Sequence, residues 1–293
     1  MGPLITLNNG VQMPALGFGT LDRESPEQVA DAVEAALAAG YRLIDTAASY
    51  AVERQVGEGI ARSGIGRTDL FVTTKLWIAD YGYDKALRAC EVSLRKLGLD
   101  YVDLYLLHWP VPSDFATTIA SYRAAEKLLA EGHVQAIGVS NFSPKHLHGL
   151  IEQTGVPPAV NQVELHPFFT QPEVRAANAR HGIVTQAWSP IGGVYLKQRT
   201  PASGPLSHTV IAEIAARYSK TPAQIVLRWH IEHGCSAIPK SLNPDRIAEN
   251  FDIFDFALTR SDIAAIDALD TGVGAGPDPE RVDTKLFTWK VED

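Results

Sequence analysis

The feature of this sequence that most constrains its fold is a regular alternation of short apolar runs with longer segments of helical periodicity. Strands that are separated by helices pair in parallel, and strands that are apolar nearly throughout are buried on both faces of their sheet. Each of the eight apolar runs is followed by a helical pattern. The predicted strands cover residues 15–19, 42–45, 70–75, 102–108, 134–140, 159–165, 183–189 and 235–240.

Eight strand–helix units in 293 residues predict a (β/α)8 TIM barrel, and we expect residues 1–293 to form a single domain. The alternative is an open doubly wound sheet, which in its dinucleotide-binding form carries a G-x-G-x-x-G turn after the first strand. In the run GFGTLD, Asp22 stands where the third glycine belongs, so the barrel is favoured. The Asn8-Asn9-Gly10 turn between LITL and VQMPAL predicts an N-terminal β-hairpin, and a C-terminal extension follows the last helix.

Polar residues in front of the helical patterns indicate where several helices begin. Ser25 precedes Pro26, and Ser143 precedes Pro144, in the order that an N-cap and a first-turn proline take. Asp84 is the expected N-cap of the pattern DKALRACEVSLRKLG. These signals place the predicted helix starts to within a residue or two.

The charge and the cysteine content exclude several classes of partner. The net charge is −8, which argues against a nucleic acid or an anionic membrane surface as the main partner. The two cysteines, Cys90 and Cys235, are too few and too far apart for a disulfide framework or a metal cluster. With no leader-like N-terminus and no apolar run of transmembrane length, we expect a cytoplasmic protein.

Polar residues stand at the ends of three consecutive predicted strands, which is where barrel enzymes place their sites. The second strand ends in Asp45, the third in Lys75 and the fourth in His108, and Tyr50 lies on the loop after the second. One polar residue at a strand end is usually just the start of a loop. Three in succession, with a tyrosine beside them, indicate a functional site.

These four side chains suit proton transfer. An isolated tyrosine titrates near about pH 10, too high for an acid–base catalyst at neutral pH, but a nearby lysine cation favours the phenolate. A buried Lys75 needs a counter-charge, which Asp45 could supply, and His108 is placed to hydrogen-bond a substrate oxygen. The set therefore describes an acid that protonates a carbonyl oxygen. Since it contains no nucleophile and no metal cluster, we expect the attacking reagent to be hydride from a cofactor.

Later strand ends offer places for such a cofactor. Trp188 could stack on a flat ring, although a packed aromatic at the barrel rim is an equally common reason for a tryptophan there. The run SPIGG that includes the next residues can present backbone N–H groups to phosphates. In PKSLNPDR, Lys240, Ser241 and Arg246 surround a helix start, which suits a phosphate monoester as well as a solvated basic turn.

Five motifs together resemble the aldo-keto reductase family, and the resemblance runs from the hairpin to about Phe256. The motifs are GYRLIDTAASYAVERQVGEGI, LLHWPVP, IGVSNF, NQVELHP and IPKSLNPDRIAENF. The short segment after His108-Trp109-Pro110 is similar to the prokaryotic branch that includes the 2,5-diketo-D-gluconate reductases. The resemblance implies a monomeric barrel that reduces small carbonyl compounds with NADPH.

The resemblance also implies a role for individual residues. Asp45, Tyr50, Lys75 and His108 match the catalytic tetrad, with Tyr50 as the general acid. The implied cofactor residues are Gly19 and Thr20 beside the ribose, Ser140, Asn141 and Gln162 at the carboxamide, Trp188 on the nicotinamide ring, Ser189, Ile191 and Gly192 along the pyrophosphate, Lys240, Ser241, Leu242, Asn243 and Arg246 around the 2′-phosphate, and Glu249 and Asn250 at the adenine. The implied walls of the substrate pocket are Leu21, Trp77, Trp109 and Trp289.

Three residues depart from the usual pattern of the family. Leu21 replaces a common aromatic residue, which should widen one wall of the pocket. Val52 stands where asparagine is usual, which affects the turn after the tetrad tyrosine. Asp245 lies among the 2′-phosphate residues and is expected to weaken the preference for NADP, although Lys240 and Arg246 remain.

Two other functions are compatible with the same sequence. A relative without catalysis, acting as a nucleotide-binding sensor or accessory subunit, would share the fold. A barrel hydrolase would need paired carboxylates or a metal set at the strand ends, for which Glu164 with His166 is the one hint. The complete tetrad favours the reductase over both.

Overall fold

The computed structural model describes residues 2–193 and 204–291, and its centre is a parallel sheet of eight strands. Neighbouring strands in the sheet follow chain order from β3 to β10, so each strand pairs with the one before it. The strands are β3 (Phe18–Gly19), β4 (Leu43–Asp45), β5 (Phe71–Leu76), β6 (Val102–Leu107), β7 (Val134–Ser140), β8 (Val160–Glu164), β9 (Val184–Trp188) and β10 (Ser236–Ala237).

Hydrogen bonds between the first and last strands close the sheet into a barrel. The Gly17 N–H donates to the Ala237 carbonyl at 2.9 Å, and the Ala237 N–H donates to the Ala15 carbonyl at 3.0 Å. A third bond of 3.0 Å joins the Gly19 N–H to the Pro239 carbonyl. An open doubly wound sheet would leave these strands as free edges. The predicted (β/α)8 barrel is therefore confirmed, and the open-sheet alternative is wrong.

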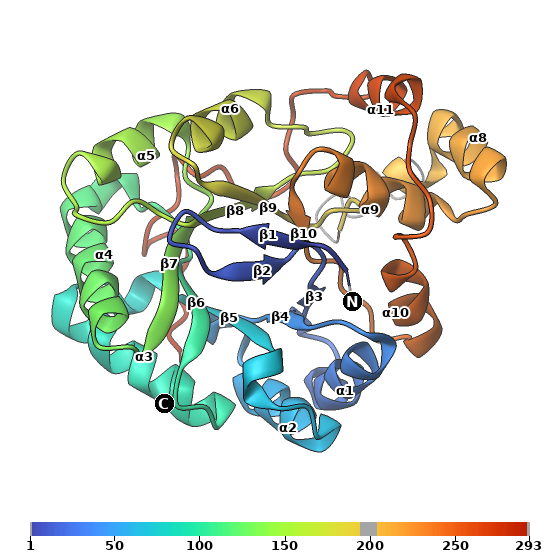
Figure 1. Ribbon diagram of the computed structural model, residues 1–293. Helices are drawn as coiled ribbons and strands as arrows, with labels where there is room; N and C mark the ends of the chain where they lie inside the picture. The colour runs from blue at the N-terminus through green and yellow to red at the C-terminus, as the bar shows by residue number, and fades with distance from the viewer. Residues whose placement is uncertain (1, 194–203, 292–293) are drawn as a thin grey trace.

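Helices surround the barrel, as Figure 1 shows in a view from the end where the hairpin lies. The first three each end at a glycine in the left-handed conformation that stops a helix, Gly40, Gly64 and Gly98. Within residues 2–193 and 204–291, no helix has the length and apolar character needed to cross a membrane. The helices are α1 (Val29–Ala39), α2 (Glu53–Ser63), α3 (Tyr83–Leu97), α4 (Phe115–Ala130), α5 (Pro144–Ile151), α6 (Pro172–Arg180), α8 (Thr209–Tyr218), α9 (Pro222–Glu232), α10 (Pro244–Phe251) and α11 (Arg260–Asp267).

The predicted helix starts hold at Ser143, hold at Ser25 in position but without the side-chain bond, and fail at Asp84. Ser143 caps α5, because its hydroxyl accepts the N–H of the third helical residue. Ser25 makes no side-chain cap bond, since a 3-10 turn, Pro26–Gln28, comes before α1. Asp84 lies in the first turn of α3, and Gly82 takes the N-cap position with its N–H bonded to the Ser121 hydroxyl at 2.8 Å.

The N-terminal hairpin, β1 (Leu4–Thr6) and β2 (Gln12–Pro14), covers one end of the barrel. Leu7 and Met13 are buried in one apolar cluster with Leu43 and Phe71, the first residues of β4 and β5. The hairpin therefore closes the N-terminal end of the strands. A ligand would approach from the opposite end, where the C-terminal ends of the strands meet their loops.

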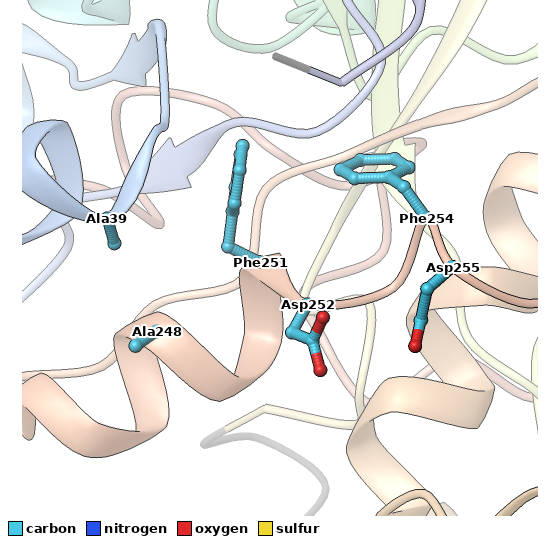
Figure 2. Close-up of a pocket in the computed structure, with 6 residues that line it drawn as sticks. All are labelled: Ala39, Ala248, Phe251, Asp252, Phe254 and Asp255. Carbon is cyan, nitrogen blue, oxygen red and sulfur yellow. The ribbon is translucent and has the colours of Figure 1, made fainter.

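A hollow of about 450 Å³ lies on the outside of the helix layer. Figure 2 shows its two phenylalanine rings pointing to one side and its two carboxylates to the other. The carboxylates, Asp252 and Asp255, each pair with Lys220 at 2.8 Å. The helices run antiparallel to the strands of the barrel, so helix C-termini lie near the N-terminal ends of the strands. The hollow is at the C-terminal ends of α1 and α10, and it is therefore on the hairpin side of the barrel. Its lining residues are Ala39, Ala248, Phe251, Asp252, Phe254 and Asp255.

Close packing of α2 against α3 gives a prediction about stability. A Cβ at Gly57 would lie 2.3 Å from the Leu97 carbonyl oxygen. Because the obstacle is backbone, we expect Gly57→Ala to lower the free energy of unfolding by about 1–3 kcal/mol, despite the higher helix propensity of alanine.

The matched control is Gly149→Ala in α5, where the nearest atom to a new Cβ is an edge of the Phe115 ring at 3.3 Å. That ring can shift, so this variant should change the free energy of unfolding by less than about 1 kcal/mol. Urea denaturation followed by circular dichroism measures both variants. Equal stability of the two would contradict the packing described here.

Candidate active site

The centre of the candidate site is a buried ion pair. Asp45 ends β4, Lys75 lies near the end of β5, and the lysine Nζ is 2.5 Å from Asp45 Oδ1 and 2.8 Å from the Thr46 carbonyl oxygen. The side chains of Asp45 and Lys75 are 1% and 0% exposed. Burial raises the pKa of the Asp45 carboxyl and lowers the pKa of the Lys75 ammonium, and the attraction within the pair opposes both changes.

Tyr50 stands directly beside this ion pair. It ends the 3-10 helix Ala48–Tyr50 on the loop after β4, and Lys75 Nζ donates to its hydroxyl oxygen at 3.4 Å. Its ring is edge-on to the His108 ring, with 5.7 Å between the centroids. Tyr50 is half-buried, so part of its side chain is accessible to solvent.

His108 completes the four predicted catalytic residues, all of which lie together. Burial lowers the pKa of His108 well below its ordinary value, and the positive charges of Lys75 and Arg23 lower it further. The imidazole is therefore neutral near neutral pH. Its Nδ1 lies 3.4 Å from the Ser49 hydroxyl.

Tryptophans from the loops and from the C-terminal tail wall the space beside His108. Trp77 stacks on Trp289 with 5.0 Å between the centroids and an interplanar angle of 19°, and its Nε1 donates to the Trp289 carbonyl at 3.0 Å. Trp109 lies parallel to the His108 ring at 6.3 Å. Leu21 is half-buried in the loop after β3. The three predicted tryptophans thus pack into one aromatic cluster with His108.

Glu164 ties the C-terminal tail to the barrel. Its carboxylate oxygens accept the N–H groups of Ala275 and Gly276, each at 2.9 Å, and one of them lies 3.2 Å from His166 Nε2. Burial raises the pKa of Glu164, but these bonds lower it overall to below its ordinary value. The pair that hinted at a hydrolase is therefore an anchor for the tail, which brings Trp289 onto the pocket.

A series of hydrogen bonds joins the predicted nicotinamide residues to the ion pair. Trp188 Nε1 donates to Asn141 Oδ1 at 2.8 Å, and Asn141 Nδ2 donates to Ser140 Oγ at 3.1 Å. Ser140 Oγ donates to the Gln162 carbonyl at 2.8 Å, and Gln162 Nε2 donates to Asp45 Oδ2 at 2.7 Å. The four predicted nicotinamide residues thus form one hydrogen-bonded series that ends at Asp45.

Backbone strain is concentrated on the loops of this end of the barrel. Ala51, Val111, Asn141 and Ser189 have φ values of 59°, 44°, 67° and 49°, in the region that favours glycine. Each comes shortly after a strand that carries a predicted site residue. Such strain persists where the surrounding structure fixes it, commonly at functional sites. The family usually has an asparagine at position 52. In this chain the preceding residue, Ala51, takes the left-handed turn, and the Val52 side chain is buried.

The predicted 2′-phosphate residues gather at the start of α10. Asn243 caps this helix by accepting the Arg246 N–H at 3.0 Å, and Arg246 and Asp245 are exposed. Lys240 forms an ion pair with Asp22, which the sequence pattern did not foresee. The two residues lie 218 positions apart, so only the closed barrel brings them together.

The remaining predicted cofactor residues are divided between α10 and the segments that follow or end the strands. The Thr20 hydroxyl donates to the Asp45 carbonyl at 3.0 Å, and Glu249 accepts a 2.8 Å bond from the Thr221 hydroxyl. Asn250 is buried in α10 at 5% exposure. Gly19 ends β3, and the others lie on the loops after β9 and β10: Ile191, Gly192, Ser241 and Leu242.

Two residues of this site, Asp22 and Arg23, were not identified from the sequence. Burial raises the pKa of the Asp22 carboxyl, but its bonds to Lys240, Ser25 and Glu24 lower it overall. The guanidinium of Arg23 lies over the Trp289 ring, 5.1 Å from its centroid. The sequence marks Asp22 only as the residue in place of the third glycine of a dinucleotide-binding turn. No local pattern marks either residue as part of a site.

Comparison with known proteins agrees with this geometry. Residues 15–271 match the model of the aldo/keto reductase family. The chain is 55% identical over 289 residues to morphine 6-dehydrogenase of Pseudomonas putida, covering 97% of each protein. It is 45% identical over 280 residues to methylglyoxal reductase DkgA of Escherichia coli, covering 95% of this chain and 97% of that one.

A solved structure adds to these relatives. An aldo-keto reductase of Bombyx mori, in complex with NADP, superposes with a TM-score of 0.87 at 36% identity, covering 98% of this chain and 97% of that one. Both the sequence and the barrel therefore lead to one conclusion: this chain belongs to the aldo/keto reductase family.

Proposed function

We propose that this protein reduces aldehydes and ketones to alcohols, with NADPH as the hydride donor and Tyr50 as the general acid. By its family, the chain is an NADP-dependent oxidoreductase. The observation that carries the finer proposal is the buried series Asp45–Lys75–Tyr50, held at 2.5 Å and 3.4 Å between successive polar atoms. In this series the Tyr50 hydroxyl is the proton donor, and the Lys75 ammonium is a fixed positive charge next to it.

The residues of this site fit NADPH. Trp188 is half-exposed at the end of β9, next to the amide of Asn141, which suits a planar ring with a carboxamide. The left-handed turns at Ser189 and Gly192 leave a loop that can approach phosphates closely. The start of α10, with Arg246, suits the 2′-phosphate. When bound, NADPH supplies the hydride that adds to the carbonyl carbon.

The protein side of the reaction is proton transfer. The neutral His108 accepts from the Ser49 hydroxyl at Nδ1 and donates from Nε2 to the carbonyl oxygen, which orients it. The Tyr50 hydroxyl then gives its proton to that oxygen as the C=O bond becomes a C–O single bond. Lys75 stabilises the tyrosinate that remains, and Asp45 compensates Lys75. Solvent returns a proton to the half-buried Tyr50.

The aromatic pocket supports small substrates. Trp77, Trp109 and Trp289 favour small aldehydes, dicarbonyls or keto sugars over charged macromolecules. The alternative, a catalytically silent nucleotide sensor, would have no need of a buried lysine that contacts a half-buried tyrosine. Binding of NADPH without turnover of any member of a broad aldehyde panel would support that alternative.

We also propose that residues 1–293 act as one barrel domain and that the protein is a monomer in the cytoplasm. The tail supports the first point, because the segment around Ala275 is bonded to β8 and Trp289 is bonded to Trp77. Light scattering coupled to size-exclusion chromatography tests the monomer, since a dimer would have twice the 31.8 kDa mass.

The proposed acid gives a direct prediction. Tyr50→Phe should lower kcat for a model aldehyde by at least about 100-fold, because a general acid contributes that much or more. The dissociation constant of NADPH should stay the same. Tyr105→Phe is the matched control, since its buried hydroxyl has no hydrogen-bond partner in the described structure. A Tyr50→Phe enzyme as fast as the parent would show that another group supplies the proton.

The pair of Lys240 with Asp22 gives a second prediction. If Lys240 must leave Asp22 to bind the 2′-phosphate, then Asp22→Asn should tighten NADPH binding by about 3- to 10-fold. Asparagine keeps the Oδ1 acceptor that bonds the Glu24 and Ser25 N–H groups, so the loop should be preserved. NADH has no 2′-phosphate, and its affinity should not change.

Quenching of tryptophan fluorescence measures both affinities. Lys240→Met is the opposite control, because it should weaken NADPH binding and spare NADH. Equal effects of Asp22→Asn on the two cofactors would mean that this ion pair has no part in cofactor choice.

A further inference from the structure

A cation stands beside the tryptophan-walled pocket. Arg23, on the loop after β3, lies with its guanidinium carbon 5.1 Å from the centroid of the Trp289 ring. Trp289 stacks on Trp77 at 5.0 Å, and Trp77 meets the His108 ring edge-on at 5.3 Å. A continuous series of contacts therefore connects the exposed Arg23 with the imidazole at the reacting end of the pocket.

The charge of Arg23 is left uncompensated in the described part of the chain. No aspartate or glutamate within residues 2–193 and 204–291 forms an ion pair with it. Asp22, the nearest carboxylate in sequence, pairs with Lys240 and accepts the N–H groups of Glu24 and Ser25. Because Asp22 is engaged with these groups, it does not pair with the neighbouring Arg23.

This charge acts on the reacting end of the pocket. Besides burial, the two charges that lower the pKa of His108 are those of Lys75 and Arg23. Lys75 is buried and bonded to Asp45, whereas Arg23 is exposed and its donors are available to a ligand. A negative group on a molecule whose carbonyl oxygen meets His108 would therefore be attracted to Arg23.

We propose that Arg23 is a specificity residue that binds a carboxylate on the substrate, so that carbonyl acids are preferred over their neutral counterparts. The planar guanidinium matches a carboxylate with two parallel hydrogen bonds, and stacking on Trp289 limits the orientations of its side chain. The inference rests on the proposed reductase function. It extends that function by naming the chemical group that distinguishes the preferred substrates.

A pair of aldehydes of similar shape tests the inference. The NADPH-dependent reduction of 4-carboxybenzaldehyde is compared with that of its neutral methyl ester, methyl 4-formylbenzoate. For the parent enzyme we expect kcat/KM to be up to about 5-fold higher for the acid, as for a partly exposed charge pair. Arg23→Gln, which keeps a hydrogen-bonding side chain without the charge, should abolish that preference by raising KM for the acid.

The control variant is Arg260→Gln, which makes the same change in net charge at an exposed position on α11. It should keep the preference of the parent enzyme. A parent that reduces the ester as well as the acid, or an Arg23→Gln variant that keeps the preference, overturns the inference while the reductase function stands. Absence of turnover of both aldehydes by the parent overturns the reductase function and this inference together.

Discussion

The site depends on a single buried ion pair, Lys75 with Asp45. An ammonium group at 0% exposure is tolerable only because it is bonded to Asp45 and to a backbone carbonyl. Asp45 in turn accepts from Gln162. The pair itself joins the neighbouring strands β4 and β5, whereas the bond from Gln162 reaches Asp45 from β8, four strands away in the sheet. The curled sheet therefore supports the pair from a strand that is distant in the sheet order.

The loops and the C-terminal tail supply the aromatic residues and the sharp turns that surround this pair. The strained residues Asn141 and Ser189 turn the chain sharply just after their strands, and Glu164 holds the tail by two N–H groups. The tail then places Trp289 against Trp77. The barrel provides a rigid base with fixed charges, while the pocket that selects the substrate is assembled from segments distant in sequence.

Periodicity and strand ends were enough to predict the barrel and to bring Asp45, Lys75 and His108 to one place, because parallel strands all end on the same side. The partners Asp22 for Lys240 and the tail for Glu164 could not be predicted, since no local pattern encodes a contact between residues more than a hundred positions apart. The local capping signal at Asp84 also failed, because a neighbouring helix contacts the start of α3. Gly82 caps α3 in place of the expected Asp84 because the Ser121 hydroxyl of α4 accepts its N–H.

The most direct test of the account is the pH dependence of aldehyde reduction by the double variant Asp45→Asn/Lys75→Met. Removing both charges leaves neither member of the pair as an uncompensated buried ion, so the protein should still fold and bind NADPH. The account predicts that kcat falls by at least about 100-fold and that the limb due to loss of the Tyr50 proton moves to higher pH. A double variant with the kcat and pH profile of the parent would contradict the central role given to the buried pair.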